Sequence, residues 1–119
     1  MATGSQKYEA YDQLYPEYNR VELIKHYVVE HLENDLSASV VANEFKISLS
    51  TLHHLFQKYG EQTYQRYVEE VRMNKAIYLI TKEGFRVSEA MYATGYQHRA
   101  TFNAAFKRKF NHTPRHFRK

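Results

Sequence analysis

The feature that most constrains this chain is a pattern of two short helices around a tight turn, which occurs twice in 119 residues. The two copies are offset by 50 residues when Leu52 is aligned with Phe102, and by 49 residues when Ile47 is aligned with Tyr96. They therefore match apart from one residue added near the second turn. Two short helices with three or four residues between them are typical of a helix-turn-helix unit. For the first copy taken alone, an ordinary helical hairpin remains an alternative.

Three helices are predicted before and within the first copy. From Arg20 onward the apolar residues Val21, Ile24, Val28 and Leu32 recur at helical spacing. Ser37 is a suitable N-cap for a short helix that ends at about Phe45. Ser48 is a second N-cap, for a helix that ends at Gly60.

A longer helix is predicted over residues 63–82, between the two copies, and Gly84 ends it. Its apolar positions predict an inward face made of Tyr64, Tyr67, Val68, Val71, Ala76, Leu79 and Ile80.

The second copy follows directly. Val87 opens a short helix, Gly95 forms the turn, and a second helix carries Phe102. Thr113 and Pro114 are a cap and a first-turn proline, which predict one more short helix near the end of the chain.

The predicted fold is all-α. No stretch shows the alternation of β-branched residues that is typical of a strand. We expect about seven helices, arranged as two homeodomain-like helix-turn-helix subdomains joined by a long linker helix. Residues 1–18 are polar and rich in tyrosine, which indicates a leader or linker. Residues 19–119 would form the domain, with a first unit over 19–61, the linker helix over 62–83 and the second unit over 84–119.

Charge is distributed unevenly along the chain. Residues 1–60 hold five Lys or Arg against eight Asp or Glu, whereas residues 61–119 hold twelve against five. From residue 97 to the end there are seven Lys or Arg and no acid. A segregated basic region suits a phosphate backbone or another acidic partner.

The helix near residue 99 is predicted to have two faces of different chemistry. Aromatic residues and Ala105 lie on one face, and Ala100, Asn103, Ala104 and Lys107 lie on the other, with Arg99 near the N-terminal end. Asn can hydrogen-bond adenine, Arg can bind guanine, and alanine can contact a thymine methyl group. The arrangement therefore predicts a helix that packs on its own domain and reads base edges in a DNA groove.

The same projection gives candidates in both units. The base-reading candidates are Ser50, His53, His54 and Gln57 in the first unit, and Arg99, Ala100, Asn103 and Ala104 in the second. The phosphate-binding candidates are Lys58, His98, Thr101, Lys107, Arg108, Lys109 and Arg118.

These residues resemble the bacterial AraC/XylS transcription regulators over about residues 20–118. The most specific part is a C-terminal signature, matched by Ala90, Gly95, Tyr96, Phe102, Phe106, Lys107, Phe110, Pro114, Phe117 and Arg118. The resemblance implies two helix-turn-helix units on one chain, and reading helices that start at Ser48 and near His98. It also implies specific binding of double-stranded DNA and regulation of transcription in the bacterial cytoplasm, at the nucleoid.

Two positions depart from the family pattern. Asn111 stands where glycine is usual, and asparagine is the next-best residue for a left-handed turn. Lys46 replaces a residue that is often glycine or asparagine in the first turn. Arg72 matches a family position on the linker helix, where we expect it to bind neighbouring carbonyls rather than DNA.

The resemblance also implies further partners. An activator would contact RNA polymerase, and family regulators usually carry a second domain for sensing or dimerisation, which we expect to be missing at the N-terminal side. No membrane contact and no cofactor are expected.

Other functions receive less support from the sequence. An enzyme would need a positioned nucleophile, base or metal site, and no cysteine, glycine-rich phosphate loop or metal-binding spacing is present. His112 and His116 are four residues apart, but a predicted helix start between them disfavours a zinc site. Two alternatives stay open: a helical protein-interaction module, and a nucleic-acid binder without sequence preference that uses the basic C-terminal face.

Overall fold

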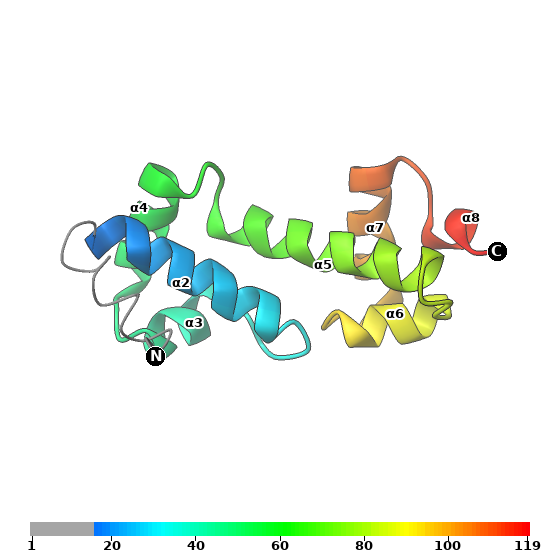
Figure 1. Ribbon diagram of the computed structural model, residues 1–119, viewed down its shortest axis with the longest axis horizontal. Helices are drawn as coiled ribbons and strands as arrows, with labels where there is room; N and C mark the ends of the chain where they lie inside the picture. Colours follow the sequence, from blue (N-terminus) through cyan, green and yellow to red (C-terminus); the bar gives the residue numbers. More distant parts are fainter. Residues whose placement is uncertain (1–15) are drawn as a thin grey trace, which may run out of the picture. The chain divides into compact units, whose positions relative to one another are not determined.

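A computed structural model describes residues 16–119. Seven α-helices follow one another in this part of the chain, and it contains no strand (Figure 1). They are α2 (Pro16–Glu30), α3 (Ala38–Glu44), α4 (Leu49–Tyr59), α5 (Tyr64–Thr81), α6 (Val87–Ala93), α7 (Arg99–Phe110) and α8 (Pro114–Phe117). The all-α prediction is therefore confirmed.

The start of α2 differs from the prediction. The helix begins at Pro16 rather than Arg20, and Asn19 is already buried in it. Proline is compatible with a first helical turn because the amide hydrogen that it lacks has no partner there. The greater part of the predicted leader, residues 1–15, lies outside the described residues.

Contacts divide the chain into two compact units. Within the described part, unit 1 contains residues 16–30 and 37–64, and unit 2 contains residues 31–36 and 65–119. The loop that connects α2 to α3 thus belongs to unit 2, although both of those helices belong to unit 1.

The core of unit 1 lies where α2 and α3 meet α4. Its fully buried side chains include Val21, Ile24, Val28, Val41, Leu52 and Phe56. Tyr64 is also buried, and its ring meets the Phe56 ring edge-on at 5.3 Å between centroids. The apolar spacing that predicted α2 is thereby confirmed as far as Val28.

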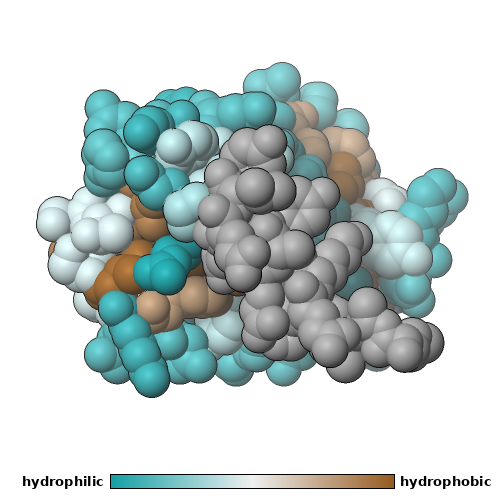
Figure 2. Space-filling view, turned by 60° about the vertical axis from the view of Figure 1, so that its left-hand side comes forward, coloured by the Kyte–Doolittle hydropathy of each residue, from teal (hydrophilic) through white to brown (hydrophobic). Residues whose placement is uncertain are grey.

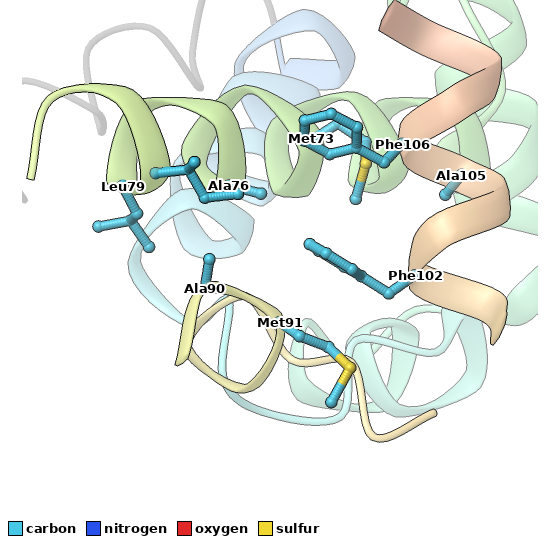
Figure 3. Close-up of a cluster of buried hydrophobic side chains, with 9 residues drawn as sticks. Met73, Ala76, Leu79, Ala90, Met91, Phe102, Ala105 and Phe106 are labelled. Atoms are coloured by element: carbon cyan, nitrogen blue, oxygen red, sulfur yellow. The ribbon is translucent and has the colours of Figure 1, made fainter. Parts of the chain in front are cut away.

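Three helices build the core of unit 2 (Figure 3). Side chains from α5, α6 and α7 form one buried cluster, and its members are Met73, Ala76, Leu79, Ile80, Ala90, Met91, Phe102, Ala105 and Phe106. The predicted inward face of α5 is confirmed for Tyr64, Val68, Ala76, Leu79 and Ile80, whereas Tyr67 and Val71 are only half-buried. Met73 was not predicted, yet it is fully buried.

The turns of the two units are both left-handed at one residue. Gly95 has a φ of 90° and Lys46 a φ of 57°. Lys46 therefore adopts the turn conformation in place of glycine, at a cost of about 1 kcal/mol. Asn111 ends α7 with a φ of 65°, as expected for the glycine position of the family pattern.

The described surface is largely polar on the face shown in Figure 2, with apolar areas between hydrophilic residues. Among the described helices, none has the length and apolar character required to cross a membrane.

Candidate nucleic-acid interface

In unit 1, α4 presents its predicted polar residues to solvent. Ser48 caps the helix, because its Oγ accepts a hydrogen bond from the Thr51 amide at 3.0 Å. Leu52, Leu55 and Phe56 are buried. The opposite positions are all exposed, and they are Ser50, His53, His54, Gln57 and Lys58.

Lys58 has partners within unit 1. Its Nζ lies 3.9 Å from a carboxylate oxygen of Glu17 and 5.2 Å from the centre of the Tyr59 ring. A hydrogen bond with Tyr59, together with the negative charge of Glu17, raises the pKa of Lys58. This amine therefore stays positively charged, but it does so beside a carboxylate of its own chain.

In unit 2, α7 has the two faces that its sequence predicted. Phe102 and Phe106 are fully buried and Ala105 is nearly so. The outward candidates Arg99, Ala100, Thr101, Ala104 and Lys107 are exposed, as is His98 at the N-cap, while Asn103 is half-buried. One helix thus packs on its unit through its aromatic side and leaves its opposite side, of polar residues and alanines, at the surface.

Two of the phosphate-binding candidates on α7 are held by carboxylates of α5. Arg108 Nη2 donates to both carboxylate oxygens of Glu69, at 3.1 and 3.0 Å. Lys109 Nζ lies 3.7 Å from Glu70. These pairs are partly exposed, so each stabilises unit 2 by about 1 kcal/mol or less. They connect the C-terminal half of α7 to α5.

Arg72 holds the loop over residues 31–36, as its expected structural role requires. Its Nη2 donates to the carbonyl oxygens of Asn34 at 3.1 Å and Leu32 at 3.4 Å. Its guanidinium also lies 5.6 Å from the centre of the Tyr96 ring. Burial is the main cause that raises the pKa of Tyr96. The negative charge of Glu69 raises this pKa further, whereas the positive charges of Arg72 and Arg108 act in the opposite direction.

A hollow of about 530 Å³ lies in unit 2 beside the N-terminal half of α7. Arg99 and Asn103 border it from α7, Arg86 from the N-cap of α6, and Arg115 and Arg118 from α8 and its C-cap. Arg86 and Arg115 were not among the predicted site residues. Arg115 could have been identified from the basic stretch without acids that runs from residue 97 to the end, whereas Arg86 stands between Glu83 and Glu89 and carries no such signal.

The two histidines considered as a metal site stack on each other. The rings of His112 and His116 are nearly parallel, with centroids 4.0 Å apart. Across residues 16–119 no group of three or more His, Cys, Asp or Glu side chains could hold a metal ion.

The sequence also matches a known family. The profile described as a helix-turn-helix domain covers residues 41–119, which is more than half of the chain. Those residues contain α4 to α8, and with them both candidate reading helices. The chain belongs to the AraC-type helix-turn-helix family.

Curated relatives place the AraC-type domain within longer regulators. The chain is 30% identical over 100 residues to the HTH-type transcriptional activator RhaS from several strains of Escherichia coli. The match covers 84% of this chain but 36% of RhaS, so the chain spans about a third of the length of these relatives.

Solved structures share the AraC-type fold. One is the C-terminal domain of the two-component response regulator yesN from Fusobacterium nucleatum, with 25% identity and a TM-score of 0.79 over 85% of this chain and 99% of the other. The C-terminal domain of AraT from Geobacillus stearothermophilus has a TM-score of 0.78 at 23% identity, covering 82% of each chain. The second likeness concerns the fold alone.

Membership of the AraC-type family settles the broad class of function. It is a family of DNA-binding transcription regulators, not of enzymes. The chain therefore contains a DNA-binding domain of this family.

Proposed function

We propose that α4 and α7 are the two helices that read the DNA, each from its own segment of the major groove. The observation that carries this proposal is the division of α7 into a buried aromatic side and an opposite side on which Arg99, Ala100 and Ala104 are exposed and Asn103 is half-buried. Such a helix can lie in a groove without uncovering the core. The predicted DNA-binding region, residues 19–119, is extended to residues 16–119, because α2 begins at Pro16 and Glu17 pairs with Lys58 of α4.

The exposed side chains suit base edges. Asn103 can bond the N6 and N7 positions of adenine, and Arg99 can donate two hydrogen bonds to guanine. Ala100 and Ala104 are short enough to let α7 approach thymine methyl groups closely. In α4 the corresponding readers are Ser50, His53, His54 and Gln57.

The cations are proposed to bind phosphates, but not equally. Lys58, Arg108 and Lys109 each have a carboxylate within 4 Å, whereas Lys107 and Arg118 form no ion pair among the described residues. We therefore assign the larger contribution to Lys107 and Arg118, together with His98 and Thr101 at the start of α7.

The length of α5 supports a single asymmetric site. Its 18 residues span about 27 Å. Successive major-groove segments on one side of B-DNA are about 34 Å apart. We propose that one chain occupies two adjacent major-groove segments, over about 20 base pairs, and bends the DNA where its groove spacing differs.

The wider role is also a proposal. RhaS is named a transcriptional activator and is much longer than this chain. We propose that this domain acts beside an N-terminal sensing or dimerisation domain, at the bacterial nucleoid in the cytoplasm. An activator of this kind would also contact RNA polymerase.

Substitution of the reading residues tests the proposal. Replacing Arg99 or Asn103 by Ala should weaken binding to a duplex selected from a random pool by about 1 to 3 kcal/mol. Preference should relax at one base position, and affinity for random duplex should barely change. Lys107→Ala is the control, because it should weaken binding to both duplexes alike. If Arg99→Ala and Asn103→Ala weaken binding to the selected and the random duplex equally, as Lys107→Ala should, these two side chains contact phosphates instead. If no preferred duplex can be selected, a protein-interaction module or a binder without sequence preference is favoured.

A spacing change tests the linker. Inserting five base pairs between the two contacted segments of the selected duplex rotates one of them by about half a turn. Affinity should then fall to that of a single unit on its own segment. An insertion of about ten base pairs returns both segments to the same side of the duplex but moves them farther apart. It therefore distinguishes the effect of rotation from the effect of distance. Unchanged affinity after the five-base-pair insertion would contradict adjacent-groove binding by one chain.

A further inference from the structure

The four arginines around the unit 2 hollow differ from the other arginines of unit 2. Within residues 16–119, Arg86, Arg99, Arg115 and Arg118 form no ion pair, whereas Arg108 and Lys109 are paired and Arg72 binds carbonyls. No Asp or Glu lines the hollow. The unpaired guanidinium groups of unit 2 are thus collected at one place.

Unit 1 provides a comparison within the same molecule. A hollow of about 430 Å³ borders α4 there, lined by His53 and Gln57 among others. It has no Lys or Arg in its lining, and Glu61 contributes a carboxylate. A hollow beside a reading helix is therefore not cationic by default, and the four arginines are particular to unit 2.

Four like charges around one space repel one another unless an anion lies between them. Guanidinium groups bind phosphate through paired, charge-assisted hydrogen bonds, and arginine is the usual residue for such planar recognition. The half-buried Asn103 amide borders the same space and can donate a further hydrogen bond. Phosphate is therefore the anion that this lining suits.

Position favours a phosphate of the DNA backbone. Arg99 and Asn103 belong both to the lining of the hollow and to the proposed reading side of α7. A duplex read by these two residues would bring its backbone past the hollow. We propose that Arg86, Arg115 and Arg118 together hold one backbone phosphate next to the base pairs that α7 reads, an inference that rests on the proposed function.

Salt dependence gives the first test. Arg86→Gln, Arg115→Gln and Arg118→Gln should each weaken binding to random and selected duplexes and lower the salt slope by up to about one. The Arg86→Gln/Arg118→Gln double variant should also lower it by about one, because both side chains share one phosphate. Arg20→Gln, an exposed arginine of α2 with the same charge change, is the control and should leave the slope unchanged. A loss of about two in the double variant would contradict a shared phosphate, and an unchanged slope in all three single variants would contradict any phosphate there.

Removing the phosphate charge gives the second test. Single phosphates of the selected duplex are replaced one at a time by neutral methylphosphonate. The unsubstituted protein should lose about tenfold or more in affinity at one position beside the α7 segment. The Arg118→Gln variant should lose clearly less affinity than the unsubstituted protein when the phosphate at that position is replaced. Equal losses for the two proteins at every position would overturn the assignment.

Two further results distinguish a DNA phosphate from a free phosphorylated molecule, and the phosphate site from base reading by α7. Pyrophosphate, followed by phosphorus NMR, should bind only weakly in the absence of DNA. Tight binding that Arg118→Gln abolishes, with salt slopes unaffected, would assign the hollow to a free phosphorylated molecule instead. If no preferred duplex can be selected, base reading by α7 fails, but the salt slopes on random duplex still decide the role of the hollow.

Discussion

Replacing Gly95 by alanine is expected to destabilise unit 2 by about 3 kcal/mol or more, one of the largest effects of any single methyl group in this chain. A Cβ at this position would lie 2.2 Å from the Leu32 carbonyl oxygen and 2.9 Å from Arg72 Nη2. The φ of 90° adds the cost of a left-handed conformation. The loss should be measured as faster amide hydrogen exchange in α6 and α7, which reports the free energy of opening for this unit.

Gly84 provides the matched control. Its φ is also positive, at 72°, but nothing lies within 4 Å of a Cβ built there. Gly84→Ala should therefore lower the free energy of unfolding only by the cost of the left-handed backbone conformation for alanine, about 1 to 2 kcal/mol. Equal losses for the two variants would show that the close approach to Leu32 and Arg72 is relieved at no cost, and that conformation alone requires glycine at position 95.

Phe106→Ala is also expected to lower the free energy of unfolding strongly. The Phe106 ring is fully buried and lies 4.7 Å from Phe110, 5.7 Å from Phe117 and 6.0 Å from Phe102 between ring centroids. Truncation of such a side chain leaves a cavity and costs about 3 to 5 kcal/mol. That is a large part of the total stability of a small domain. Denaturant unfolding followed by circular dichroism should show the loss, and DNA affinity should fall with the folded fraction of unit 2.

Tyr92 is the control for Phe106. It is an aromatic residue of the same unit, on α6, but it is 62% exposed. Tyr92→Ala should change the free energy of unfolding by about 0.5 kcal/mol or less. A loss comparable to that of Phe106→Ala would mean that aromatic content, rather than burial of the ring, determines the stability of unit 2.

Much of the fold could be predicted from local patterns. Helical spacing correctly divided α4 and α7 into buried and exposed sides, because burial of one side is what fixes a helix on its domain. Asn111 and Gly95 marked the left-handed turns for the same local reason. Lys46 shows the limit of that argument, since a lysine takes the left-handed conformation there, at a turn closed by the backbone hydrogen bonds from Lys46 to Asn43 and from Ile47 to Ala42.

Features that depend on distant parts of the chain could not be predicted. Arg108 and Glu69 are 39 residues apart in sequence, and their bond follows only from the packing of α7 on α5. The hollow likewise combines Arg86 with Arg118, which belong to different helix ends. Met73 is an intermediate case: its spacing to Ala76 and Ile80 is helical, but the polar residues on either side of it obscured the pattern.

A fragment of this chain made of the second helix-turn-helix alone would lack the loop over residues 31–36. A shorter protein that begins at residue 63 would contain α5 to α8, and with them the whole second helix-turn-helix. It would lack the Leu32 and Asn34 carbonyls to which Arg72 donates, and the backbone against which Gly95 is packed. The second reading module is therefore discontinuous in sequence, because it includes six residues encoded between the first two helices of the other unit.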